Sequence, residues 1–256
     1  MAQSAPSSHP AAGAAPGNGA QRVLSRLARA RAEIAGRLVF TTSFGLEDQL
    51  LTHLIIEAGL GHEIAFATLE TGRLFPEVHD LWAETERHYG IAIRACLPDA
   101  QAIEELVAEQ GINGFRASPE ARKRCCQLRK LVPLDRALAG ASGWITGLRA
   151  DQSNARAAVA LFEPDPDRGL TKINPLHDVS REDALAAAQA LGVPLNPLHA
   201  RGFVSIGCAP CTRAIAPGEP ERAGRWWWEQ DAAKECGLHV GADGRLVRAS
   251  QPELRP

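Results

Sequence analysis

Long apolar runs are missing from this sequence of 256 residues, and no segment approaches the ~20 consecutive apolar residues that a membrane-spanning helix needs. The first twenty residues, MAQSAPSSHPAAGAAPGNGA, contain no Lys or Arg and no continuous apolar stretch. They therefore have neither the charged region nor the apolar region of a signal peptide. Their Ala, Pro, Ser and Gly content is typical of a disordered tail. These absences predict a soluble protein of the reducing cytoplasm, without a membrane partner.

A strong excess of charge of either sign is also missing. The 28 Lys and Arg nearly balance the 30 Asp and Glu, and the formal net charge is −2. This balance gives no general reason to expect nucleic acid as a partner, so any anionic ligand has to be bound by local basic clusters. The Walker pattern G-x-x-x-x-G-K-S/T is absent, which disfavours a P-loop NTPase.

Short apolar runs alternate with helical patterns, and this order predicts an α/β fold with a mainly parallel sheet covered by helices on both faces. The expected strands lie within residues 37–45, 62–70, 91–97 and 144–150. The expected helices lie within 47–59, 76–90, 100–111 and 180–192, the last with Ser180 as its N-cap. From about Asn196 the pattern weakens, so we expect an irregular carboxyl end in a single domain.

Three motifs stand at the carboxyl ends of expected strands, where doubly wound sheets bind their ligands. They are SFGLED at 43–48, LETGRLFPE at 69–77 and GLRADQS at 147–153. In the first motif, backbone N–H groups at the start of a helix are suited to a phosphate-like group. Such turns are common in α/β proteins, so this motif alone favours a structural role.

The cysteines carry a stronger signal. Cys208 and Cys211 have the C-x-x-C spacing of zinc sites, redox disulfides and iron–sulfur clusters, and Cys125 and Cys126 stand next to each other far upstream. A zinc ribbon usually has two C-x-x-C knuckles, and a thioredoxin-type motif needs no distant pair. Adjacent cysteines are better suited to the separated iron corners of a [4Fe–4S] cluster. Four buried cysteines without a ligand remain the alternative.

Basic residues accompany these cysteines. Lys130 follows Cys126 by four residues, so on a helix the two share a face, and Lys130 is placed to bridge a cluster and an anionic substrate. Arg222 and Arg225 are three residues apart, a spacing that allows both to converge on one sulfate or phosphate. A solvated basic helix face is an equally good interpretation of the residues around Cys126.

Two cysteines remain. Cys96 ends an apolar strand pattern and is interpreted as an inert core thiol. Cys236 lies in KECGLH, between Lys234 and His239. A nearby cation lowers the pKa of a thiol from about 8.5 and makes the thiolate available as a nucleophile. A lone cysteine is more often passive, so these residues alone do not establish reactivity.

Four segments together resemble the bacterial assimilatory adenylyl-sulfate (APS) reductases, within the broader phosphoadenylyl-sulfate (PAPS) reductase family. They are RKRCCQLRKLVPL, SIGCAPCT, RAGRWWWE and KECGLH, and the three strand-end motifs resemble the nucleotide-binding strand ends of that family. The resemblance implies an adenine nucleotide α-hydrolase-like fold. It implies a catalytic domain over 21–240, between a disordered tail at 1–20 and a mobile tail at 241–256.

The resemblance also implies the residues of the site. The implied ligands of a [4Fe–4S] cluster are Cys125, Cys126, Cys208 and Cys211. The implied substrate-binding residues are Ser43, Gly45, Leu69, Gly72, Arg73, Lys130, Gly147, Arg149, Arg222, Arg225 and His239. Cys236 would attack the sulfur of APS, release AMP and carry an S-sulfo group, from which reduced thioredoxin would free sulfite for cysteine biosynthesis. A mobile carboxyl end would let Cys236 close on the substrate and then meet thioredoxin.

Other functions remain open from the sequence. The nearest is a PAPS reductase or an enzyme that accepts both nucleotides, although PAPS reductases without a cluster lack the four cysteines. An ATP-dependent tRNA-thiolation enzyme would show an S-G-G-x-D-S loop and a strongly basic face, and the sequence has neither. A zinc-ribbon module without activity is the third. Glu70 departs from the Asp usual in the family, and a homo-oligomer is left open.

Overall fold

The sheet has six strands in the order β3-β2-β1-β4-β6-β5. The computed structural model describes residues 17–153 and 156–229. The strands are β1 Leu38–Thr42, β2 Ile64–Leu69, β3 Arg94–Cys96, β4 Gly143–Ile145, β5 Phe162–Asp165 and β6 Leu170–Ile173. All neighbouring strands are parallel except β5 and β6, which are antiparallel at one edge. The expected α/β class with a mainly parallel sheet is confirmed.

Seven α-helices are described. They are α1 Asn18–Glu33, α2 Leu46–Glu57, α3 Pro76–Tyr89, α4 Ala100–Gln110, α5 Pro119–Cys126, α6 Val132–Leu138 and α7 Arg181–Ala190. The four helices expected from the sequence agree closely with α2, α3, α4 and α7, and the Ser180 side chain caps α7 as expected by accepting from the Asp183 N–H. Helices α1, α5 and α6 were not expected, and α1 begins inside the segment 1–20 that was interpreted as a tail.

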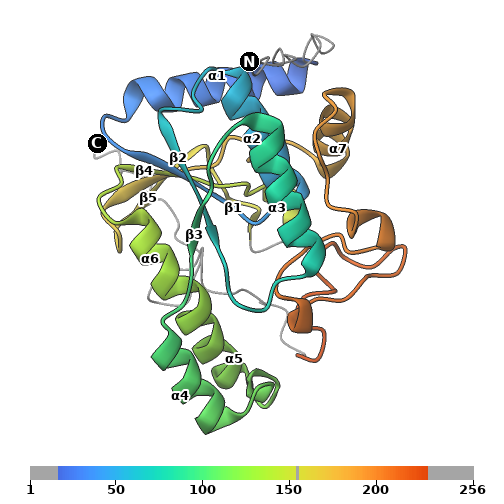
Figure 1. The fold of residues 1–256 in the computed structure, drawn as a ribbon. Helices are drawn as coiled ribbons and strands as arrows, with labels where there is room; N and C mark the ends of the chain where they lie inside the picture. The colour runs from blue at the N-terminus through green and yellow to red at the C-terminus, as the bar shows by residue number, and fades with distance from the viewer. Residues whose placement is uncertain (1–16, 154–155, 230–256) are drawn as a thin grey trace, which may run out of the picture.

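Helices cover both faces of the sheet. One core cluster joins α1, α2, α3 and α7 to the sheet through residues such as Leu38 and Phe40 of β1. The other cluster lies on the opposite face, where Val39 of β1 packs with Leu134 of α6. β1 is thus buried on both sides, as a central parallel strand should be. Helices α4 and α5 extend away from the sheet beyond α6 (Figure 1).

The strand-end motifs meet at one edge. β1 pairs in parallel with both β2 and β4, so the carboxyl ends of these three strands, and the residues that follow them, lie side by side. The strand expected within 144–150 is shorter than predicted, because β4 ends at Ile145 and leaves Gly147 in a loop. Between Asn196 and Glu229 the described chain has only short turns and one bridge, Thr212 to Arg225, as the weak pattern there predicted.

None of the helices within the described ranges is long and apolar enough to cross a membrane.

Candidate active site

A cleft of about 190 Å³ opens where β1, β2 and β4 end, and we call it the carboxyl-edge cleft. All three strand-end motifs line it, together with residues from 204–207 and 221–225. The structure brings seven of the sequence-predicted substrate-binding residues to this cleft: Ser43, Gly45, Leu69, Lys130, Gly147, Arg222 and Arg225.

The loop after β1 is held by an acidic side chain that the sequence reasoning did not single out. Asp48 accepts hydrogen bonds from the Ser43 N–H (2.6 Å) and the Ser43 hydroxyl (2.7 Å). Asp48 is buried, and burial raises the pKa of its carboxyl to about 6. Phe44 adopts a left-handed φ of 59° and stacks on Trp82, with ring centroids 5.7 Å apart. These contacts hold the loop in one conformation at the start of α2. Asp48 belongs to the SFGLED motif, so the sequence could have identified it.

Gly147 approaches this loop so closely that only glycine is compatible with the contact. A Cβ at position 147 would lie 2.3 Å from Oδ1 of Asp48 and 3.0 Å from the Cβ of Glu47. The loop after β4 is thereby packed against the first turn of α2. This contact brings two of the strand-end motifs together over the cleft.

The four cysteines predicted as cluster ligands come together around a second, smaller cavity of about 20 Å³, which we call the cysteine cavity. Cys125 and Cys126 close α5, just before the π-helical turn Gln127–Leu131. Cys208 directly precedes the short 3₁₀ turn Ala209–Cys211, and Cys211 is the last residue of that turn. None of the four forms a disulfide within the described residues. The remaining lining residues are Arg73, Phe115, Arg122, Arg129, Lys130, Pro210, Arg225 and Trp226.

Cations at the cysteine cavity favour the thiolate form of Cys208. Burial alone would raise the pKa of the Cys208 thiol, but Lys130, the Thr71 hydroxyl (3.3 Å from Sγ) and Arg225 together lower it below its ordinary value. Burial, reinforced by the charge of Cys208, raises the pKa of Cys211 to about 11. The thiols are therefore close enough to influence one another's ionisation.

No group of three His, Cys, Asp or Glu side chains within residues 17–153 and 156–229 is placed to hold one metal ion. A [4Fe–4S] cluster needs a different arrangement of ligands, because each thiolate binds a different iron atom of the cluster. Three side-chain donors of residues that line the cysteine cavity are buried without a hydrogen-bond partner in the described structure: Arg129 Nε, Arg225 Nε and Trp226 Nε1. Four thiols together with unpartnered donors fit an anionic, sulfur-rich group.

Two cationic side chains line both the carboxyl-edge cleft and the cysteine cavity. They are Lys130 and Arg225. Lys130 lies in the π-helical turn, four residues after Cys126, and both residues line the cysteine cavity. Arg225 is held beside the C-x-x-C segment by the bridge to Thr212 and by the hydrogen bond from the Trp226 N–H to the Cys211 carbonyl (3.1 Å).

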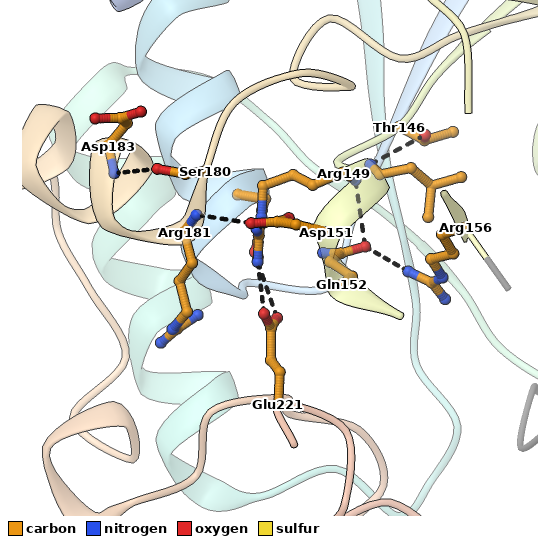
Figure 2. A network of polar contacts seen from close by, with 11 residues as sticks. Thr146, Arg149, Asp151, Gln152, Arg156, Ser180, Arg181, Asp183 and Glu221 are labelled. Carbon is orange, nitrogen blue, oxygen red and sulfur yellow. Dashed lines mark hydrogen bonds and ion pairs between the residues drawn. The ribbon is translucent and has the colours of Figure 1, made fainter. Parts of the chain in front are cut away.

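Arg149 has different surroundings from those that the resemblance implied (Figure 2). Its side chain is fully buried and is not among the described residues that line the cleft. Nε donates to Glu47 (2.8 Å), Nη2 donates to both oxygens of Glu221 (2.9 and 2.8 Å), and Nη1 donates to Asp151. Burial by itself lowers the pKa of Arg149, and Glu47 and Glu221 raise it above its ordinary range. As a substrate ligand it remains a prediction.

Arg73 lines the cysteine cavity and not the carboxyl-edge cleft, and Gly72 is not a lining residue of either one. Gly72 has a left-handed φ of 71°, and its N–H donates to Oε1 of Glu70 (2.6 Å). The other oxygen of Glu70 lies 2.5 Å from Nε2 of His79. Glu70 therefore shapes the turn after β2. Arg73 donates to the Ile112 carbonyl (2.8 Å).

The remaining sequence predictions divide in two. Cys96 is buried in the core cluster on the α6 side of the sheet, as expected. Cys236 and His239 lie outside the described residues, and their roles stay predictions.

Arg156 was missed by the sequence reasoning: it is buried, lines the carboxyl-edge cleft and donates to Gln152 (2.5 Å; Figure 2). Its position three residues after the end of the GLRADQS motif was the available signal.

A parallel sheet with a basic cleft at the carboxyl ends of its strands defines an α/β protein of the nucleotide-binding kind. The crystal structure of phosphoadenylyl-sulfate (PAPS) reductase from Candida auris, in a phosphate complex, has this fold: its TM-score is 0.64 at 23% identity, over 75% of this chain and 90% of that one. The model of the phosphoadenosine phosphosulfate reductase domain matches residues 37–214. The chain belongs to this family.

Within the family, the similarity is to the adenosine 5′-phosphosulfate reductases. The chain is 57% identical to such a reductase of Sinorhizobium fredii over 210 residues, which is 82% of each sequence. It is 52% identical to one of Allochromatium vinosum over 219 residues, which is 86% of this chain and 83% of the relative.

Proposed function

We propose that this chain reduces adenosine 5′-phosphosulfate, the adenylyl sulfate (APS) of the sequence analysis, to sulfite and AMP. The proposal includes a [4Fe–4S] cluster at the four cysteines and reduced thioredoxin as the electron donor, in the reducing cytoplasm. The observation that carries it is the position of Lys130 and Arg225, which line both the cysteine cavity and the carboxyl-edge cleft. A cluster site and a nucleotide site that share two cations suit an enzyme that acts on an anionic sulfonucleotide.

The cleft offers distinct contacts for the two ends of APS. Ser43 and Gly45 place the amino end of α2 at the cleft, where backbone N–H groups favour an anion. Leu69 and Gly147 line the same cleft and supply nonpolar surface for the nucleotide. Lys130, Arg222 and Arg225 supply positive charge for the phosphosulfate.

The proposed reaction transfers a sulfo group to Cys236. The Cys236 thiolate attacks the sulfur atom of APS, an S–S bond forms, and the bond between sulfur and the bridging oxygen breaks with its electron pair leaving on AMP. The cleft cations Lys130, Arg222 and Arg225, together with His239, stabilise the charge that develops on the oxygens during this transfer. The role of Cys236 rests on its KECGLH motif.

Thioredoxin then completes the turnover. A thiolate of reduced thioredoxin attacks Sγ of Cys236, and sulfite leaves with the electron pair of the S–S bond. The second thiol of thioredoxin resolves the mixed disulfide, which returns the Cys236 thiol and leaves oxidised thioredoxin. The two electrons come from the dithiol. When bound, a cluster would supply a fixed charge distribution and would tie α5 to the C-x-x-C turn.

The test combines activity with metal analysis. The anaerobically purified protein should release sulfite from APS with reduced thioredoxin, and it should contain about four irons and acid-labile sulfide per chain, the stoichiometry of such a cluster. Its kcat/KM for APS should exceed that for PAPS. A higher kcat/KM for PAPS would assign the chain to the related reductases, and zinc without iron would refute the cluster.

A further inference from the structure

Carboxylates line the cleft in which an anionic nucleotide is proposed to bind. Glu47, Asp48 and Glu221 are lining residues, alongside the basic side chains of Lys130, Arg156, Arg222 and Arg225. A carboxylate near a phosphate or sulfate repels it, and the effect is strong where little water screens the charges. The cleft therefore needs a means of neutralising these acids if it is to attract an anion.

One guanidinium group neutralises two of them. Arg149 pairs with Glu47, in the first turn of α2. It also pairs with Glu221, which directly precedes Arg222 (Figure 2). The Glu221 contact is bidentate, at 2.9 and 2.8 Å. Burial raises the pKa of Glu221, Arg149 lowers it, and the charge of Glu47 raises it again, so the two carboxylates lie within each other's field.

Direct contact between Arg149 and substrate is disfavoured by burial. The Arg149 side chain has 0% exposure, whereas the side chains of Glu47 and Glu221 are 13% and 16% exposed and lie between it and the cleft. Reaching a ligand would break hydrogen bonds to two partly buried carboxylates and leave both unpaired. The third partner, Asp151, is 46% exposed and is solvated without Arg149.

We infer that Arg149 is a positioning residue: it binds Glu47 and Glu221 so that they are neutralised and held away from the bound anion, and it makes no contact with the substrate. The identity of that anion rests on the proposed function. Without Arg149, both carboxylates compete with the ligand for the cations of the cleft. Affinity for the anionic part of a nucleotide then depends on a residue that the ligand never touches.

The test compares AMP with adenosine, because the two share the nucleoside and differ in the anionic group. Calorimetric titration of the full-length, iron-loaded protein should show that Arg149→Met weakens AMP binding by at least about tenfold, which corresponds to about 1.4 kcal/mol. The affinity for adenosine should change by less than about threefold. Arg149→Lys should give an intermediate loss for AMP, because an ammonium group keeps the charge but not the two-sided fork.

A second substitution separates neutralisation from contact. In Arg149→Met/Glu221→Gln, one of the freed carboxylates is gone, so most of the AMP affinity should return. Arg26 is the matched control, since it makes a bidentate pair with Asp178 and neither residue lines the cleft. Arg26→Met should leave both affinities unchanged. If Arg149→Met does not fold by circular dichroism, the comparison of Arg149→Lys with Arg149→Lys/Glu221→Gln replaces it.

Three results would overturn the inference: equal losses for AMP and adenosine, no recovery of AMP binding on adding Glu221→Gln, or wild-type AMP affinity in Arg149→Met. A wild-type protein that binds neither ligand and releases no sulfite from APS would contradict the proposed function itself. The two failures are therefore distinguishable.

Discussion

Gly207→Ala should displace the Arg225 guanidinium from its place between the cysteine cavity and the carboxyl-edge cleft. A Cβ at position 207 would lie 2.3 Å from Nη2, 2.4 Å from Cζ and 2.9 Å from Nη1 of Arg225, all shorter than the 3.0 Å below which Cβ contacts essentially never occur. Gly207 is not among the described glycines with a left-handed φ, so alanine is compatible with its backbone. The steric conflict with Arg225 is therefore the main effect.

The magnitude follows from what surrounds Arg225. Its side chain is buried and lies over the Trp226 ring, with Cζ 4.7 Å from the ring centroid, so it has little room to move. Overpacking of this kind costs about 1–3 kcal/mol of stability. We expect the lower half of that range, because the clashing atoms are the end of a long side chain. The loss of one preorganised cationic donor should lower kcat/KM for APS about 100-fold.

Urea unfolding and sulfite release measure the two effects separately. Gly19→Ala in α1 is the matched control, because nothing lies within 4 Å of a Cβ there. That variant should be at least as stable as wild type, because alanine has the higher helix propensity, and it should keep full activity. Wild-type kcat/KM in Gly207→Ala would refute the reasoning, since it would mean that turnover does not need Arg225 where the structure holds it.

Three further outcomes are expected. Cys208→Ser should lose iron and Cys96→Ser should keep it, because Cys208 lines the cysteine cavity whereas Cys96 lies in the core cluster; metal analysis of both variants checks this. Cys236→Ser should keep iron and AMP affinity but lose turnover, and wild-type protein given APS without thioredoxin should gain one SO₃ group on the Cys236 peptide; an adduct on another cysteine would contradict the role. Burial raises the pKa of Asp48 from 3.8 to about 6, so its contribution to stability is fully present below pH 3.8 and is lost as the pH rises through 6. Unfolding of Asp48→Asn and wild type across this range should show the variant gaining up to about 3 kcal/mol relative to wild type, and a difference independent of pH would contradict the assignment.

Local patterns determined much of the fold. The apolar runs at β1, β2 and β3 and the helical periodicity of α2, α3, α4 and α7 are properties of short segments, so they could be predicted one by one. The antiparallel pair β5 and β6 could not. Each has only four residues, and Glu163 and Lys172 face each other across the pair, so no apolar alternation marks them. Their antiparallel pairing depends on the reversal of chain direction between β5 and β6.

The chemical character of the site was also present in the sequence. Two cysteine pairs, three strand-end motifs and the basic residues near them are local patterns, and the structure brings the cysteines together as predicted. The environment of each charged side chain was decided only by the tertiary structure. Arg149 meets Glu47 and Glu221 across 102 and 72 residues of chain, and Gly207 meets Arg225 only because the last described segment folds back over the C-x-x-C turn. The field and the free space around a group come from residues that are neighbours in space, and the sequence orders residues only along the chain.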